Sequence, residues 1–457
     1  MSLRVAMISE HANPLALLGG VDAGGQNVYI DAVSRGLAER GFAVDVFTRR
    51  EREDQPRVVP LTAGVRVVHV PVGPPRFLPK DDLWPLMPTF RNAIERMTRA
   101  HPRYDIIHGN FWMSGWVATE LAERWRVPAA QIFHATGVTK RREQGEADTS
   151  PSERIEIERE TVRRAQRTIA QCPAERDELI AEYDADPHRI ALIPSAVDLE
   201  RYRPAPQRAA RQSLGLDADP DAQIVVYVGR MVPRKDVRNI IRALALLKSR
   251  RNGEGNGRLP QLYLVGGETE DPDPVATPEI GILRALAAEL GVAELVTFVG
   301  RRQPAELHRW YSAADVAVTT PWYEPFGLTP LEAMACACPV IGADVGGISF
   351  TVVDGETGFL VPAKDPAALS ARLEMVLRDG ALRERLARAG RERVEREFTW
   401  TMAARRTAAL YVDLLNEGGE SVSRSVGKNE QIAFPRRSTG RLADSPADRL
   451  ARRGATT

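Results

Sequence analysis

The chain has 457 residues, which is too long for one ordinary domain and suggests two or three. Hydrophobic residues make up 43% of it and charged residues 27%, a composition typical of soluble globular proteins. The formal net charge of +1 at pH 7 argues against nucleic acid or an anionic membrane surface as the principal partner, so any basic site has to be local.

Three cysteines, Cys172, Cys336 and Cys338, are too few for a disulfide framework and suit a reducing, cytoplasmic compartment. Cys336 and Cys338 lack two further ligands at zinc-site spacing, so we expect small buried residues rather than metal ligands. The first nine residues have too short an apolar stretch for a signal peptide and are predicted to form a strand. No apolar run is long enough to predict an integral membrane segment.

Short β-branched runs alternate with helical patterns from residue 3 to residue 193. Strands are predicted at residues 5–8, 43–47, 65–70, 106–108, 131–134, 168–170 and 190–193. The clearest helices are predicted at residues 27–40, 89–99, 116–124 and 152–167. This alternation predicts a mostly parallel sheet that is covered by helices on both faces.

The alternation starts again after residues 202–206, where two prolines and no clear period suggest a linker. Strands are predicted at residues 224–229, 261–265, 296–299, 316–320, 340–343 and 358–361. Helices are predicted at residues 237–248, 280–290, 304–313, 331–335 and, in several pieces, 366–417. Exposed loops are predicted at residues 249–259 and 269–278, because both are rich in glycine, proline or charge.

The sequence therefore predicts an α/β protein with two doubly wound, Rossmann-like units facing each other across a cleft. We place the first at residues 1–198 and the second at residues 199–398. A helix at residues 399–417 is expected to pack back on the first unit. Residues 418–457 have few large apolar residues and no periodicity, and are predicted to be a disordered tail.

Residues 321–333 mark a turn from a strand through a loop to a helix, and such turns hold ligands in α/β sheets. Thr329 suits the N-cap of that helix, Pro330 its first position, and Glu332 the carboxylate of a capping box. A cap would explain Glu332 but not Glu324, which follows two aromatic residues in an otherwise apolar loop. Both readings of Glu332 stay open from the local sequence.

Further anion-binding features follow other predicted strands. A loop ending in Gly24 and Gly25 precedes a helix, where backbone N–H groups could bind a phosphate; the alternative is a flexible turn. Arg230, Arg234 and Lys235 follow the first strand of the second unit and could clamp a diphosphate, or form only a solvated basic loop. The fingerprint of a dinucleotide site and the P-loop are both absent. Together these features suit a nucleotide diphosphate in a cleft between the units.

Six sequence motifs, called landmarks below, make the chain similar to a known protein family. It resembles the retaining glycosyltransferases of the GT-B fold in family 4 (group 1), in the group with the sucrose-phosphate synthases and the D-inositol-3-phosphate glycosyltransferases. The landmarks, in family order, are Gly20-Val21-Asp22-Ala23-Gly24-Gly25-Gln26-Asn27, Lys80-Asp81-Asp82-Leu83-Trp84-Pro85, His108-Gly109-Asn110-Phe111-Trp112, His134, Gly229-Arg230 with Lys235, and Glu324-Pro325-Phe326-Gly327 with Glu332.

The resemblance implies a nucleotide diphosphate sugar of the UDP-glucose or GDP-mannose type as co-substrate, with no metal and no further cofactor. It also implies retention of the anomeric configuration, with the leaving phosphate taking the acceptor's proton. The catalytic residues would be His134, Arg230, Lys235 and Glu324. The donor would be bound by Gly24, Gly25, Phe326, Gly327, Leu328, Thr329 and Glu332, the last holding the ribose.

The acceptor would lie in the first unit and the donor mainly in the second. Acceptor-binding residues carried over from the resemblance are Asn27, Lys80, Lys140 and Arg154, whose three cations suggest a phosphorylated sugar or polyol. Phe111 and Ala135 stand where relatives have a tyrosine and a hydroxyl residue, which removes polar contacts to an acceptor. The usual Asn-Gly of the interdomain turn is changed to Ser195-Ala196.

Other readings belong to different classes. A polysaccharide or lipid precursor could be the acceptor in place of a phosphorylated small molecule. An epimerase acting on a sugar nucleotide shares this fold but lacks the Glu-Pro-Phe-Gly pattern. A sensor without activity is opposed by the presence of Arg230, Lys235, Glu324 and Glu332. The sequence does not indicate an oligomeric state.

Overall fold

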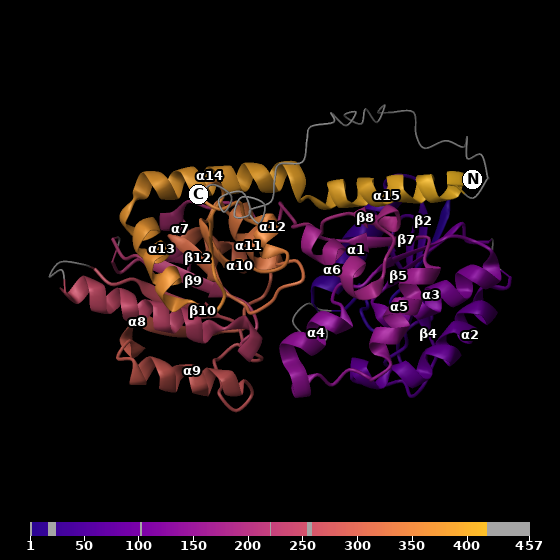
Figure 1. The fold of residues 1–457 in the computed structure, drawn as a ribbon, viewed down its shortest axis with the longest axis horizontal. Coiled ribbons are helices and arrows are strands. Elements are labelled where there is room, and N and C mark those ends of the chain that lie inside the picture. Colours follow the sequence, from indigo (N-terminus) through magenta and orange to yellow (C-terminus); the bar gives the residue numbers. More distant parts are fainter. Residues whose placement is uncertain (1, 17–23, 101–102, 220, 254–257, 418–457) are drawn as a thin grey trace, which may run out of the picture. The chain divides into compact units, whose positions relative to one another are not determined.

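The computed structural model describes residues 2–16, 24–100, 103–219, 221–253 and 258–417. These residues belong to one compact unit that contains two sheets. The predicted disordered tail, residues 418–457, and most of the glycine loop, residues 17–23, lie outside the described residues. The two sheets confirm the predicted architecture of two doubly wound units (Figure 1).

The first sheet has the strand order β3-β4-β2-β1-β5-β6-β7-β8. All neighbouring strands in it are parallel except β3 and β4. The strands are β1 (Arg4–Ile8), β2 (Ala43–Arg49), β3 (Val58–Thr62), β4 (Val65–Val70), β5 (Ile106–Asn110), β6 (Ala129–Ile132), β7 (Arg167–Ala170) and β8 (Ile190–Leu192). The helices are α1 (Gly25–Ala38), α2 (Met87–Thr98), α3 (Trp112–Trp125), α4 (Gly137–Gln144), α5 (Arg154–Arg164) and α6 (Pro173–Tyr183).

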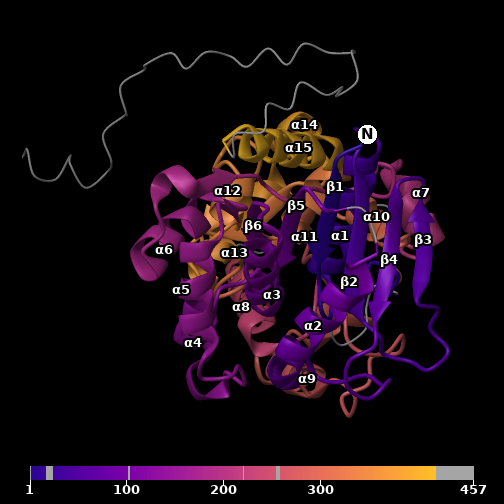
Figure 2. The same ribbon diagram turned by 90° about the vertical axis from the view of Figure 1, so that its right-hand side faces the viewer.

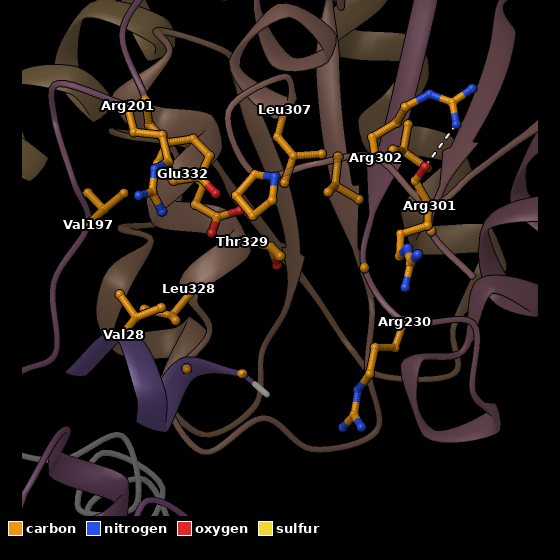
Figure 3. A pocket seen from close by; sticks show the side chains of 18 of the residues that line it. Val28, Val197, Arg201, Arg230, Arg301, Arg302, Leu307, Leu328, Thr329 and Glu332 are labelled. Carbon is orange, nitrogen blue, oxygen red and sulfur yellow. Dashed lines mark hydrogen bonds between the residues drawn. The ribbon is translucent and has the colours of Figure 1, made fainter. Parts of the chain in front are cut away.

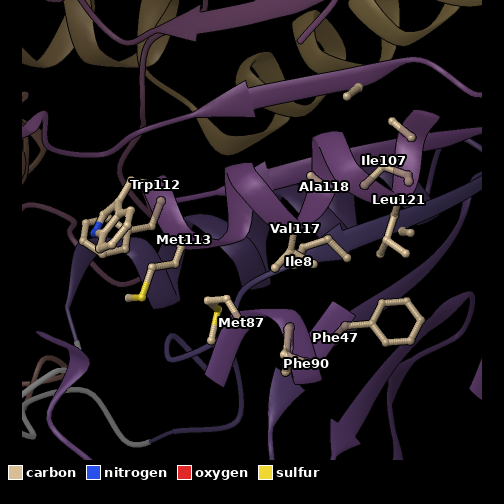
Figure 4. Close-up of a cluster of buried hydrophobic side chains, with 14 of the residues drawn as sticks. Ile8, Phe47, Met87, Phe90, Ile107, Trp112, Met113, Val117, Ala118 and Leu121 are labelled. Carbon is tan, nitrogen blue, oxygen red and sulfur yellow. The ribbon is translucent and has the colours of Figure 1, made fainter. Parts of the chain in front are cut away.

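The core between this sheet and helices α2 and α3 is apolar and close-packed (Figure 4). Phe90 of α2 and Val117 and Leu121 of α3 pack against Ile8 and Ile107 from the central strands. The buried apolar area fixes these helices on the sheet, which in turn fixes where each strand ends. The carboxyl ends of β1, β5 and β6 therefore lie side by side at one edge.

The second sheet is parallel throughout, in the order β11-β10-β9-β12-β13-β14. Its strands are β9 (Ile224–Val228), β10 (Gln261–Val265), β11 (Val296–Gly300), β12 (Val316–Thr319), β13 (Val340–Ala343) and β14 (Phe359–Val361). Its helices are α7 (Gln207–Ser213), α8 (Val237–Gly253), α9 (Pro278–Glu289), α10 (Leu307–Ala313), α11 (Leu328–Ala335), α12 (Ile348–Thr351), α13 (Pro366–Arg378) and α14 (Gly380–Glu397).

The last helix, α15 (Trp400–Glu417), packs against α1 of the first half (Figure 2). A Cβ atom on Gly36 of α1 would lie 2.4 Å from the Cβ atom of Ala404, so the two helices approach closely where Gly36 stands. Tyr411 and Leu414 enter the same buried cluster as Ile30 and Val33. α15 thus contributes to the core of the half that is farthest from it in sequence.

Several predicted elements differ from the structure. The loop predicted at residues 249–259 is wrong at its start, because α8 continues to Gly253. The strand predicted at residues 131–134 ends at Ile132. Strand β3 was not predicted; it contains Pro60, which an edge strand tolerates because one side of its backbone has no strand partner. Helices α4 and α6 were also not predicted.

Two further findings concern cysteines and membranes. All three cysteines are buried and free, which confirms the predicted burial of Cys336 and Cys338. In the part of the chain that the structure describes, no helix combines the length and the apolar character that crossing a membrane requires.

Candidate active site

Three adjoining cavities lie where the two halves meet. The central cavity, of about 490 Å³, is lined by loops from both halves, including Gly25, His134, Arg230 and Glu324. The Arg301 cavity, of about 420 Å³, extends from it toward Arg301 and Trp400. The Lys140 cavity, of about 680 Å³, lies between α4 and α6 of the first half and the loop before α11.

Every residue predicted to be catalytic or donor-binding lines the central cavity, as do Asn27 and Lys80. Lys140 and Arg154 line the Lys140 cavity together with Lys80. Residues that are as far apart in the sequence as Gly24 and Glu332 are thus brought together around one space.

The loop before α11 depends on Gly327, whose φ of +83° lies in the left-handed region that favours glycine. Gly327 is the N-cap of α11, and the helix begins at Leu328 with no side-chain cap. The predicted N-cap at Thr329 is therefore wrong, because the left-handed glycine turns the chain into the helix two residues earlier. The backbone N–H groups at the start of α11 line the central cavity, where the helix dipole favours an anion.

Glu332 does not act as a capping-box residue. Its Oε2 accepts a hydrogen bond from the hydroxyl of Tyr311 at 3.0 Å, and the hydroxyl of Tyr202 also stabilises the charged carboxylate. Burial raises the pKa of Glu332, although both tyrosine hydroxyls act in the opposite direction. The carboxylate lines both the central cavity and the Arg301 cavity, so it stands where the two spaces join.

Glu324 forms an ion pair with Lys235, whose Nζ donates a hydrogen bond to its Oε2. Arg234 lies 3.9 Å from the same oxygen, and its carbonyl accepts a hydrogen bond from the backbone N–H of Trp322 at 2.9 Å. Burial alone would raise the pKa of Glu324, but the charges of Lys235, Arg234 and Arg230 hold it below its usual value. Glu324 is therefore a carboxylate at neutral pH.

Arg230 differs from its basic neighbours because its guanidinium makes no hydrogen bond or ion pair with any residue that the structure describes. It follows β9 and lines all three cavities. The backbone carbonyl of Arg230 accepts a hydrogen bond from Tyr227 at 2.9 Å, which fixes the main chain below the side chain. An exposed guanidinium at this point can bind a phosphate by two parallel hydrogen bonds.

The first half approaches α11 through Gly25, at the start of α1. A Cβ atom at this position would lie 3.1 Å from a methyl carbon of Leu328, so the halves meet closely here. The side chain of Asn27 accepts from the N–H of Gly24 at 3.0 Å and donates to the carbonyl of Asn13 at 2.9 Å. Asn27 thus shapes the turn at Gly24, and its contact with an acceptor stays a prediction.

His134 follows β6 in the left-handed region, with φ of +60°. Its Nε2 lies 3.3 Å from Oδ1 of Asn110, and its ring meets the edge of Tyr29 at 4.9 Å between centroids. Burial, with the nearby His108 and His11, lowers the pKa of His134 to about 3. The imidazole is therefore neutral at physiological pH.

Two of the cations predicted to bind an acceptor phosphate have carboxylate partners. Lys140 Nζ lies 2.9 Å from Asp148 and 3.7 Å from Asp81. Arg154 is buried and pairs with Glu158 at 2.8 Å. A phosphate would have to share these cations with the carboxylates.

Several residues of the site were not predicted. Figure 3 shows Arg201 and Glu332 at one end of the Arg301 cavity, and Arg301 and Arg302 at the other. Arg301 and Arg302 directly follow β11, so their place after a strand was a usable signal. Asn110 stands at the end of a predicted strand and within one of the landmarks, but no role was assigned to it. Tyr311 and Tyr202 gave no such signal, because each reaches the site through a contact distant in sequence.

Two family models match the chain. The model described as Glycosyltransferase Family 4 matches residues 23–201, and the model described as Glycosyl transferases group 1 matches residues 208–393. The first match falls on the first sheet and the second on the second sheet.

Named relatives and a solved structure cover most of the chain. The D-inositol 3-phosphate glycosyltransferase 2 of Catenulispora acidiphila is 39% identical over 413 residues, which are 89% of this chain and 94% of that protein. A D-inositol 3-phosphate glycosyltransferase of Thermobispora bispora is 39% identical over 93% of this chain and 96% of its own length. The structure of a sucrose-phosphate synthase from Thermosynechococcus elongatus is similar with a TM-score of 0.80 at 34% identity, over 91% of this chain and all of that chain.

Proposed function

Because the chain belongs to family 4 of the glycosyltransferases and has the GT-B fold, we propose that it is a retaining hexosyltransferase whose donor is a nucleotide diphosphate sugar. That it is a glycosyltransferase follows from the family; the donor, the acceptor and the stereochemistry are proposed. The observation that supports the proposal best is the single cavity lined by Arg230, Lys235, Glu324, Glu332 and His134.

The donor is proposed to bind with its nucleoside in the Arg301 cavity and its ribose on the Glu332 carboxylate, at the junction with the central cavity. The diphosphate would then lie between Arg230, Lys235 and the backbone N–H groups at the start of α11. A carboxylate is a good acceptor for two ribose hydroxyls, and guanidinium and ammonium groups stabilise phosphate charge. The sugar would extend toward His134 and Glu324.

The proposed reaction breaks the bond between the anomeric carbon and the phosphate oxygen and forms a bond from the same carbon, on the same face, to the acceptor oxygen. The acceptor's hydroxyl proton passes to the departing phosphate oxygen. Arg230 and Lys235 stabilise the charge that develops on the diphosphate, a form of electrostatic catalysis.

We propose a phosphorylated polyol or sugar as the acceptor, bound in the Lys140 cavity beside Lys80, Lys140 and Arg154. Two relatives at 39% identity are named D-inositol 3-phosphate glycosyltransferases, which supports this class. Phe111 lines the same cavity without a hydroxyl and stacks under the Arg154 guanidinium at 5.0 Å.

The free, buried cysteines support a reducing, cytoplasmic compartment.

Purified protein incubated with UDP-glucose or GDP-mannose should release nucleotide only when a suitable acceptor is present. Inositol phosphates and hexose phosphates would be tested beside their unphosphorylated forms, with nucleotide measured directly by chromatography. Release that requires the phosphorylated form supports the proposal. A donor sugar that is isomerised without nucleotide release would instead identify an epimerase, and transfer only to a polysaccharide or lipid precursor would correct the acceptor.

Turnover should not change in 10 mM EDTA, on the order of the concentration that removes bound divalent cations, because Arg230 and Lys235 provide the positive charge that a metal would supply. The measurement is nucleotide release without coupling enzymes, so that the chelator acts on this protein alone. Loss of activity that Mg²⁺ restores would contradict the proposed role of the two cations.

A further inference from the structure

Asn110, the last residue of β5, is completely buried and has a fixed side-chain orientation. Its Nδ2 faces two carbonyl oxygens, of Ile8 at 3.3 Å and of His108 at 3.5 Å. A carbonyl oxygen can only accept a hydrogen bond, so the amide nitrogen has to be the group on that side. The amide oxygen Oδ1 consequently faces the other way, toward His134.

The orientation of Asn110 decides which nitrogen of His134 carries the proton. Oδ1 can only accept, and it lies 3.3 Å from His134 Nε2, so Nε2 is the protonated nitrogen. The ring is neutral at pH 7, which leaves a lone pair on Nδ1. Nδ1 makes no hydrogen bond with a residue that the structure describes, and the side chain lines the central cavity.

We propose that Asn110 is a positioning residue that holds His134 in the Nε2–H tautomer and so presents the Nδ1 lone pair to a hydroxyl group of the bound sugar. The ligand in this inference rests on the proposed function, whereas the protonated nitrogen follows from the hydrogen bonds and the neutral ring from its burial. His134 then accepts a hydrogen bond from the substrate and has no proton to donate from Nδ1. It cannot serve as a general acid from this side of the ring.

The same protein contains a histidine of the opposite tautomer, which provides an internal reference. Asn13 Oδ1 accepts from the N–H of Leu15 at 2.9 Å, so Asn13 Nδ2 faces His69 Nε2 at 3.2 Å and donates to it. His69 therefore carries its proton on Nδ1, which lies 2.6 Å from the carbonyl of Pro56. The rings of His134 and His69 should therefore show opposite protonated nitrogens in the same ¹⁵N NMR spectrum.

The first test is the tautomer itself, measured by NMR on the full-length protein labelled with ¹⁵N in its seven histidines. We expect the proton of His134 on Nε2 and that of His69 on Nδ1. His134→Gln and His69→Gln assign the two signals. Finding His134 protonated on Nδ1 would overturn the inference, whatever the enzyme transfers.

The second test uses two substitutions of Asn110. Asn110→Leu removes the acceptor, and we expect mixed tautomers at His134 and a roughly 10- to 100-fold lower kcat, as for other residues that orient a functional side chain. Asn110→Asp restores an acceptor and should restore the Nε2–H tautomer and part of the kcat at pH 8. Thr119→Val, a buried change on α3 away from His134, is the control for general loss of packing.

The pH profile provides a further readout. Burial lowers the pKa of His134 to about 3 in the wild-type protein, so its titration should not affect kcat between pH 5 and pH 8. In Asn110→Asp the oxygen that replaces Nδ2 faces the carbonyl oxygens of Ile8 and His108, so the buried carboxyl is expected to stay protonated and to donate there, while its other oxygen accepts from His134. The kcat of Asn110→Asp should therefore be as independent of pH between pH 5 and pH 8 as that of the wild-type protein. A wild-type tautomer in Asn110→Leu would refute the positioning role. Absence of sugar transfer in the wild-type protein would refute the proposed function and leave the tautomer result standing.

Discussion

Arg230→Ala is expected to lower kcat by about 100- to 1000-fold, the size of effect seen when one group that stabilises transition-state charge is removed. The guanidinium has no partner among the described residues, so its removal leaves no buried charge behind. The free energy of unfolding should change by less than about 0.5 kcal/mol, as for other surface substitutions. Nucleotide release and urea unfolding measure the two quantities.

Arg208→Ala is a matched control, because Arg208 is also exposed but lies on α7, outside the three cavities. It should leave kcat at the wild-type value. Near-normal turnover in a well-folded Arg230→Ala protein would show that the diphosphate is neutralised by other groups.

Lys235→Ala should lose both activity and stability, in contrast to Arg230→Ala. We expect turnover to fall by more than about 100-fold, because the charge that we propose to lie next to the leaving phosphate is lost. The Glu324 carboxylate would also remain largely buried, with only the more distant Arg234, 3.9 Å from its Oε2, as an ion-pair partner. The free energy of unfolding should fall by about 3 kcal/mol, the lower end of the range for broken buried pairs, since both side chains keep some exposure.

A double variant separates the two effects of Lys235. Lys235→Met with Glu324→Gln removes both charges while keeping side chains of similar volume, so most of the lost stability should return. Turnover should stay low, because neither side chain can then stabilise the diphosphate or contact the sugar as a charge. Recovery of turnover together with stability would mean that the pair only supports the fold of the loop.

The elements that could be predicted are those with a strong local pattern. The bounds of β4, β10 and β13 agree with the predicted strands, since each is a short, mostly apolar run that is largely buried in its sheet. The gathering of Gly25, Arg230 and Glu324 also followed from sequence, because each comes after a predicted strand and the carboxyl ends of parallel strands share one edge.

What could not be predicted depends on contacts between distant residues. Glu332 resembled a capping-box residue because its local spacing fits one, and only the fold brings Tyr311 and Tyr202 to its carboxylate. The orientation of Asn110 depends on a carbonyl of β1, which lies about a hundred residues earlier in the chain. Such contacts leave no period and no spacing in the sequence.

The packing of α15 on α1 has a consequence for the order of events during synthesis. Ile30, Val33 and Leu37 of α1 share a buried cluster with Tyr411, Leu414 and Leu415 of α15. The ribosome makes α1 first and α15 almost last. The apolar surface of α1 therefore stays unpacked while more than 360 further residues are synthesised. Tyr411 also supplies the hydroxyl that lies 2.6 Å from Nδ1 of His108, in strand β5 of the first sheet. The first half therefore reaches its final form only after the second half has been translated, which couples the maturation of the two.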